Sequence, residues 1–539
     1  MKSSTFQPSG SREIANPNPK PHPRAGHRRH PGRWKPGAVL VLGACALVWL
    51  CVAHARAAGV LPSKWVYPSL MGDLLYGSDT NGVRINDFSD CGYQRGNVAL
   101  PDMRQFIPEA QWIRLTPLEN GQDNAAMINA ALYFAGTRPL GTNGFRGVVF
   151  LEAGEYRVDS TIWMTNSGVV LKGAGSSLTT GTRLRATFAS FDDLISVGRD
   201  IEEIEVPWGQ LTEWLVPAGT RTFRVDNAAL FKPGDPVWVQ HLAAWNWIRD
   251  LDMDKLNGQW IGLDGNTGDY ERKITRIEGN WITVDSPIPQ TFEWKYGGGY
   301  IRTMTNFTRV ENCGVEDLIG TFGVNPGDSD TTHPRAVVTI HDSVNIWMRN
   351  VFGSGYFTSC ANVRARSRFI TVAECQMLHP SNSSHHDRYA FRIAESAGHV
   401  LMRDCYAENS RHDFVTESTV PGPNAFVRCR TKNSDDDTGP HQRWATGLLF
   451  DLVSVDDSGD SAKTSGQLNI QNRGNSGGGG SYHGWAGAYS VVWNSFAQSG
   501  YRVRNPPLAL NWLIGSYGQT LSSMNGCWWS PFWFGEGDC

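Results

Sequence analysis

Histidine and arginine recur at matching places within residues 369–487, and these two side chains suit acid–base work on an anion. Residues 386–390 (HDRYA) are echoed by 411–415 (RHDFV), 441–445 (HQRWA) and, more weakly, 482–486 (YHGWA). Imidazole titrates near neutral pH, and guanidinium binds carboxylates in a bidentate manner. The repeated pattern therefore predicts a site that handles an acidic substrate.

Aligning the aromatic residues of the four copies predicts three columns of side chains. The aromatic column is expected to lie inside the protein, and the two polar columns are expected to face outward. The aromatic column contains Tyr389, Phe414, Trp444 and Trp485; two residues back lie His386, Arg411, His441 and Tyr482; one residue back lie Arg388, Asp413, Arg443 and Gly484.

Three cysteines give a second measure of the repeat. Cys375, Cys405 and Cys429 are 30 and 24 residues apart, and each follows a short, mainly apolar run. Repeats of this length indicate stacked supersecondary units, and the runs are too close together for crossover helices between them. The pattern predicts an all-β, parallel solenoid in which these cysteines form a buried ladder of free thiols.

We predict a catalytic centre on neighbouring turns of this solenoid. His441 is expected to be central to it, and His483 and Trp485 are expected to bind substrate. The predicted catalytic residues are His386, Arg388, Arg411, His412, Asp413, His441 and Arg443.

Two reactions compete for this site. Elimination from a uronic acid needs a cation on the substrate carboxylate, a base for the C5 proton and an acid for the leaving oxygen, which the histidines and arginines match. Hydrolysis of a glycoside needs two carboxyl groups, for which Asp413 and a residue of the run 435–437 are the candidates. If the reaction is hydrolysis, Asp413→Asn is expected to be the most damaging substitution. If it is elimination, His441→Ala is expected to be the most damaging.

Two other interpretations involve no catalysis. The charged residues form a surface salt ladder in which Asp413 neutralises Arg388 and Arg443, or the solenoid only binds glycans. Separately, Asp435, Asp436 and Asp437 form an acidic run that is a candidate Ca²⁺ site.

The chain also resembles a known superfamily. Residues 123–132 (Asp-x-x-Ala-x-Ile-x-x-Ala-Leu), 147–158 (Gly-Val-Val-x-Leu-x-x-Gly-x-Tyr-x-Val) and 167–175 (Ser-Gly-Val-x-Leu-x-Gly-x-Gly) resemble the start of pectate-lyase-like proteins. The resemblance implies a right-handed parallel β-helix, and lyases of this fold often hold calcium. It does not fix the reaction, because one fold hosts many activities.

The remaining elements are expected in chain order. After a lead-in from residue 58, a helix from Asp123 to Ala135 is predicted to cap the first turns, which extend to residue 202. Residues 203–300 break the repeat and are predicted to form a small β insertion. Its Trp245, Trp247 and Trp260 are candidate groove walls. The main coil is expected over 301–519, and an aromatic tail over 520–539.

The amino-terminal residues 1–57 predict export. A basic leader precedes the uncharged apolar run Gly37–Ala53, and Ala55-Arg56-Ala57 offers a cleavage site. We expect a secreted, periplasmic or cell-surface protein that meets a membrane only through this segment, if it stays uncleaved.

The net charge of the chain limits which kind of molecule it can bind. Without residues 1–57 the chain loses nine of its 49 Lys and Arg but one of its 52 Asp and Glu, leaving a net charge near −11. Such a body has no general attraction for nucleic acid. The expected partner is an acidic polysaccharide.

Overall fold

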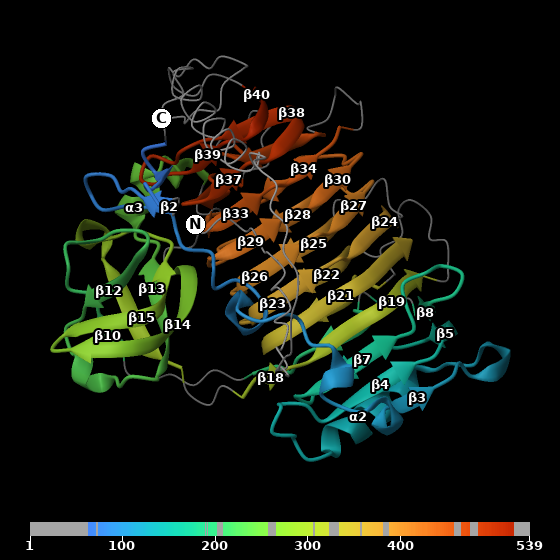
Figure 1. The fold of residues 1–539 in the computed structure, drawn as a ribbon. Helices are drawn as coiled ribbons and strands as arrows, with labels where there is room; N and C mark the ends of the chain where they lie inside the picture. The colour runs from blue at the N-terminus through green and yellow to red at the C-terminus, as the bar shows by residue number, and fades with distance from the viewer. Residues whose placement is uncertain are drawn as a thin grey trace, which may run out of the picture.

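The computed structural model describes residues 63–521, apart from the gaps 72–73, 189, 191, 202–207, 257–265, 305–307, 323–333, 356–357, 381–387, 458–464 and 475–482. Most of this part is a coil of short parallel strands stacked along one axis (Figure 1). The predicted right-handed parallel β-helix is confirmed. His386, Tyr482, Trp260 and the predicted export segment lie outside the described residues.

One turn of the coil consists of three strands, which form three faces. β23 (Arg368–Ala373), β24 (Gln376–Pro380) and β25 (Tyr389–Ile393) make one turn. The next turn is β26 (Gly398–Arg403), β27 (Tyr406–Glu408) and β28 (His412–Thr416), and each strand pairs in parallel with its predecessor.

The other strands extend these faces in both directions. The first face also contains β3 (Ile113–Leu115), β4 (Gly147–Leu151), β7 (Val169–Gly173), β18 (Val310–Glu311), β19 (Gly314–Phe322), β21 (Ser343–Gly355), β29 (Asn424–Val427), β33 (Leu448–Asp451), β37 (Val491–Trp493) and β39 (Trp512–Ile514). The second face, into which β19 and β21 continue, also contains β5 (Gly154–Val158), β8 (Thr182–Ala186), β30 (Arg430–Lys432), β34 (Ser454–Val455), β35 (Gln467–Ile470), β38 (Phe496–Val503) and β40 (Tyr517–Thr520). The third face also contains β6 (Ile162–Met164), β9 (Ile195–Val197), β20 (Ala336–Ile340), β22 (Ser359–Val363) and β31 (Gly439–Pro440), and the pair β32 (Ala445–Thr446) and β36 (Gly487–Ala488) lies apart from it.

A sharp turn joins the first and second faces. Its first residue adopts a left-handed backbone conformation, with φ of 57° at Glu374, 55° at Asp404 and 51° at Arg428. The next residue is a buried free cysteine in all three turns, and each thiol donates to a carbonyl of the preceding turn. The predicted ladder of buried thiols is confirmed.

The interior aromatic column differs from the predicted one. Phe391 stacks on Phe414 at 5.1 Å, and Phe426 stacks on Phe450 at 5.0 Å. Strand pairing places Phe414 beside Phe391, whereas Tyr389 pairs with His412. Only Phe414 of the predicted column belongs to the interior stack, because the alignment of the motifs was shifted by two residues against the strands.

Helix α2 (Ala125–Thr137) covers the first turns. Its buried residues Ile128, Leu132 and Ala135 join the core of the coil, against β4 and β6. The helix begins two residues later than predicted. Asn124 holds the N-cap position, and Asp123 accepts a hydrogen bond from the backbone N–H of Ala125 at 2.9 Å.

Residues 208–303 form a separate antiparallel module beside the coil (Figure 1). It has its own apolar core, which includes Phe223 and Tyr270. Its six-stranded sheet runs in the order β10 (Trp208–Gln210), β17 (Gly299–Thr303), β13 (Pro236–Leu242), β14 (Asn266–Glu278), β15 (Trp281–Ile288) and β12 (Thr220–Arg224). The module also contains a separate pair of strands, β11 (Leu215–Val216) and β16 (Phe292–Glu293), and helix α3 (Trp245–Asp250). The lead-in contributes β1 (Val66–Pro68) and β2 (Leu74–Tyr76).

Buried polar contacts fix this module to the coil. Arg272, which is 1% exposed, donates to the carbonyl of Gly422 at 3.0 Å. The indole of Trp444 donates to Gln290 at 3.1 Å and packs edge-on against Trp247. Trp247 is therefore a docking residue rather than a groove wall, whereas Trp245 is exposed. Within the described part of the chain, no helix has the length and apolarity to span a membrane.

The observed core register can be tested with two aromatic residues of the third face. Phe391 is fully buried, whereas Trp163 is 53% exposed. Phe391→Ala should lower the free energy of unfolding by about 3–5 kcal/mol because it opens a cavity. Trp163→Ala should change it by about 1 kcal/mol or less. Equal effects in chemical denaturation would contradict this register.

Candidate active site

Three histidines and a tyrosine form a chain of touching rings on the third face of the coil. The ring centroids of Tyr389 and His412 are 5.6 Å apart, those of His412 and His441 are 4.8 Å apart, and those of His441 and His483 are 4.7 Å apart. Tyr389 also lies 5.4 Å from His441. The structure thus brings together three histidines that the sequence predicted as one site.

Strand ends position these rings. Tyr389 and His412 begin β25 and β28 and are direct partners in the parallel register. His441 follows β31, and its backbone N–H donates to Thr416 at 2.9 Å. His483 lies four residues before β36, which pairs with β32. Side chains from four turns therefore meet without any loop that spans the coil.

His412 is the innermost of the three histidines and is neutral. It is fully buried, and burial lowers its pKa to about 3 although Asp437 acts in the opposite direction. Its Nδ1–H donates to the backbone carbonyl of Asp437 at 2.6 Å, which leaves the lone pair on Nε2. That Nε2 has no hydrogen-bond partner among the described residues.

His441 lies beside an ionised carboxylate that the sequence analysis missed. Its Nδ1 is 4.0 Å from the Glu417 carboxylate. Burial opposes ionisation of Glu417, but His441, Arg392 and Gln442 outweigh it and lower the pKa of this carboxyl to about 2. Arg392 donates to Glu417 at 3.1 Å, and Gln442 also donates to it.

His483 and Arg443 form the outer part of the site. His483 is half-buried, and burial lowers its pKa to about 4, with further contributions from His441, Arg473 and Arg443. Arg443 makes no ion pair with any described residue of the chain, and burial lowers the pKa of its guanidinium. An uncharged imidazole and an uncompensated guanidinium therefore lie together here.

The acidic run 435–437 does not form the predicted calcium site. Each carboxylate faces a different arginine: Asp435 pairs with Arg388, Asp436 with Arg411 at 2.9 Å, and Asp437 with Arg473 at 2.8 Å. The predicted salt ladder, in which Asp413 neutralises Arg388, is also wrong, because Arg388 pairs with Asp435 instead. These ion pairs neutralise the run, so it offers little to a cation.

Another acidic group is the closest to a metal site in the described part of the chain. Asp200, His341 and Asp342 bring their ligand atoms within 4.8 Å of one another. However, Asp342 already binds the guanidinium of Arg366 at 2.6 Å, and Asp200 is fully exposed. One of the three possible ligands is thus already paired with an arginine.

Asp413 faces away from the ring cluster, contrary to the predicted outward column. It is fully buried, and its strand position matches Ala390 of the previous turn, which belongs to the core. Neither carboxylate oxygen has a hydrogen-bond partner among the described residues. Burial raises its pKa to about 7, although nearby hydroxyl groups of Ser434 and Thr431 act in the opposite direction.

Trp485 lies at the junction with the antiparallel module rather than at the rings. Its indole donates to the backbone carbonyl of Leu251 at 3.2 Å, and it packs with the apolar cluster shared by the two parts. Its predicted role in substrate binding therefore gains no support from its contacts.

Three polar residues of the site carried a signal that the motif alignment overlooked. Arg392, Glu417 and Gln442 follow one another at intervals of 25 residues, and Arg392 and Gln442 both donate hydrogen bonds to Glu417. Tyr389 was placed in the interior column, although it belongs to the site. A search for polar residues that recur after 25 residues, close to the length of one turn, would have found Arg392, Glu417 and Gln442.

Comparison with known proteins adds structural neighbours but no family. No family model and no curated protein matches the sequence. The tailspike gp49 from Pseudomonas phage LKA1 is 13% identical with a TM-score of 0.33, over 69% of this chain and 57% of that one. The surface adhesin PfbA of Streptococcus pneumoniae is 9% identical with a TM-score of 0.38, over 75% and 77% of the two chains.

An enzyme is also among the similar structures. The endo-xylogalacturonan hydrolase from Aspergillus tubingensis is 12% identical with a TM-score of 0.31, over 75% of this chain and 91% of that one. The match to the tailspike spans less than two thirds of that protein. Likenesses this distant carry no conclusion about activity, which must be argued from the site itself.

The placement of Asp413 predicts how stability depends on pH. The unfolded carboxyl has a pKa near 3.9, so between about pH 4 and pH 7 the folded protein holds a proton that the unfolded chain releases. Wild-type stability should therefore fall as pH rises through this window. Asp413→Asn removes this loss and should raise the melting temperature more at about pH 8 than at about pH 5.

Asp437→Asn is the matched control for that measurement. Asp437 has a pKa lowered to about 2, with Arg473 as the main stabilising partner against burial. Its substitution should destabilise the protein at neutral pH, opposite in sign to Asp413→Asn. Two substitutions of the same sign would contradict the assigned environments.

The ion pairs between the acidic run and the arginines predict that calcium does not change the stability of the protein. Added Ca²⁺ or a chelator should leave the melting temperature unchanged, because Arg388, Arg411 and Arg473 already neutralise the acidic run. A calcium-dependent rise in melting temperature that is lost in Asp436→Ala would contradict this prediction.

Proposed function

We propose that this protein cleaves a uronic-acid-containing polysaccharide by β-elimination. The observation that carries the proposal is the chain of histidine rings beside Glu417 and Arg443. Elimination needs a side chain that can accept a proton and a cation that can bind the substrate carboxylate. The site offers both, and its described carboxylates are either buried or paired with arginine.

The proposed roles follow from these positions. Arg443 binds the uronate carboxylate and makes the proton on C5 more acidic. His441, oriented by Glu417, takes that proton, and the electron pair of the C5–H bond forms the C4–C5 double bond. The C4–O bond breaks, and the hydroxyl of Tyr389 protonates the departing oxygen. The proton then returns from His441 to Tyr389.

Hydrolysis has weaker support in this site. It needs two carboxyl groups at the scissile bond. Of the described carboxylates near the rings, Asp436 and Asp437 pair with Arg411 and Arg473. Glu417 is held by Arg392 and Gln442. Asp413, the residue predicted for this reaction, is 0% exposed. The two reactions differ in their products and can be separated directly.

The test incubates the chain without residues 1–57 with acidic and neutral polysaccharides. Elimination predicts ultraviolet absorbance from an unsaturated uronate, whereas hydrolysis predicts new reducing ends without it. New reducing ends alone, or no product from any acidic polymer, would contradict the proposal.

Substitutions assign the roles. His441→Ala should lower kcat by about 10²- to 10⁴-fold, the usual contribution of a positioned base. Arg443→Ala should lower kcat/KM, and Glu417→Gln should lower kcat while the melting temperature shows whether the fold is intact. Arg430→Ala, an exposed arginine on another face of the coil, is the control and should retain activity. Normal activity of His441→Ala would place the active centre elsewhere.

A further inference from the structure

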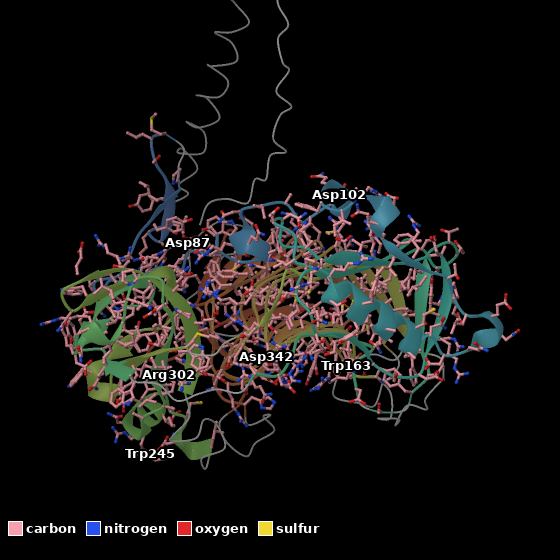
Figure 2. The ribbon with its side chains drawn as sticks, turned by 90° about the horizontal axis from the view of Figure 1, so that it is seen from below. Asp87, Asp102, Trp163, Trp245, Arg302 and Asp342 are labelled. Atoms are coloured by element: carbon pink, nitrogen blue, oxygen red, sulfur yellow. The ribbon has the colours of Figure 1, made fainter. Side chains whose placement is uncertain are left out.

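A pocket of about 260 Å³ lies at the amino-terminal end of the coil, between α2 and the strands β6 and β7. Two aromatic rings stand at its wall and remain open to solvent: Tyr133 is 68% exposed and Trp163 is 53% exposed. Figure 2 labels Trp163 at this end of the molecule. The pocket is distinct from the ring cluster of the proposed active site.

The walls of this pocket are held by the backbone. The side chain of Asn129 accepts from the backbone N–H of Trp163 at 2.8 Å and donates to the carbonyl of Thr161 at 3.0 Å. Asn129 and Tyr133 are four residues apart in α2, so they lie on the same side of the helix. These two hydrogen bonds hold the helix against β6.

The lining defines the chemistry of a ligand. It combines the two rings and apolar side chains such as Leu132 with the polar side chains of Thr165 and Asn166, and it contains no Lys, Arg, His, Asp or Glu. Aromatic rings pack against the C–H faces of a sugar, and amide and hydroxyl groups bond its hydroxyls. Pockets for drug-sized ligands span about 300–1,000 Å³, so this one suits a single neutral sugar ring.

The pocket and the proposed active site share one face of the coil. In the parallel register Trp163 matches Ser196, Thr339, Asn362 and Arg392 on successive strands. Four strand spacings of about 4.8 Å separate Trp163 from Arg392, or about 19 Å. Arg392 in turn binds Glu417 beside His441.

Polar side chains connect the two ends of this face. Asn362 donates to Thr339 at 3.2 Å and accepts from Arg392 at 3.2 Å. The side chains of Ser196, Thr339 and Asn362 in this row are buried, at 3%, 1% and 1% exposure. The row therefore links the two ends of the face structurally, and the shared face and the distance of about 19 Å are what relate the pocket to the proposed active site.

We propose that the pocket at Tyr133 and Trp163 is a distal subsite that binds a neutral sugar residue of the same polymer. The proposal rests on the proposed function for the identity of the polymer. It assigns the substrate to the class of heteropolysaccharides in which uronic acids and neutral sugars share one chain. The subsite adds affinity for long chains and takes no part in bond cleavage.

The test measures binding without turnover. His441→Ala protein is run on native gels that contain glucuronoxylan or gellan, with polygalacturonate as a polymer that has no neutral residues. Adding Trp163→Ala or Tyr133→Ala should weaken retardation by the mixed polymers about threefold to tenfold, the effect of one lost aromatic contact. Trp245→Ala, which removes another half-exposed indole, is the matched control.

Kinetics in otherwise wild-type protein give a second readout. Trp163→Ala should raise KM for the long polymer with kcat little changed, and should leave KM for short fragments unaltered. Unchanged retardation and KM would overturn the subsite, even if elimination is observed. Retardation that depends on Trp163 without any unsaturated product would instead uphold the subsite and refute the proposed reaction.

A second copy of this chain is the rival occupant. If Trp163→Ala changes the oligomeric state in sedimentation and leaves polymer binding intact, the pocket is a contact between copies and the subsite is overturned. A monomer with weakened polymer binding supports the proposal.

Discussion

Parallel pairing between successive turns is the constraint on which the rest of this protein depends. Because each strand pairs in register with the strand one turn before it, every side chain belongs to a column with a spacing of about 4.8 Å. Interior columns stack, as Phe391 on Phe414 does, and outward columns bring groups far apart in sequence within reach. The ring cluster is a direct product of this geometry.

Charge in the site is arranged by the same columns. The run 435–437 lies where three arginines from neighbouring turns reach it, and each carboxylate is neutralised separately. Burial keeps His412 and His483 uncharged, since a buried imidazolium would lose its hydration. The result is a cluster in which these two histidines are neutral and Arg443 lies at the margin, on a body that is acidic as a whole.

The antiparallel module supports this arrangement from the side. Trp444 and Trp485, which neighbour the histidines in sequence, point to the module and bond Gln290 and Leu251. One segment of the chain thus supplies both the histidines of the ring cluster and the tryptophans that hold the module against the coil. Docking through buried groups such as Arg272 makes the module part of the scaffold rather than a loose appendage.

The sequence by itself determined the coil, its repeat and the chemical types in the site. The cysteine spacings of 30 and 24 residues equal the observed shifts between β24, β27 and β30, because a tight turn of constant length precedes each cysteine. Three of the four predicted histidines meet in space, while the fourth, His386, lies outside the described residues.

Tertiary structure alone decided which residues lie in the ring cluster and which lie in the core. The connection from β24 to β25 is longer than that from β27 to β28, so the third face repeats after 23 residues where the second repeats after 30. Matching the motifs by their letters therefore slipped by two residues and moved Tyr389 into the core and Asp413 out of it. The loops that connect the strands of a solenoid can vary in length, whereas the pairing of the strands cannot. Only the folded chain therefore shows which residues of successive turns lie side by side.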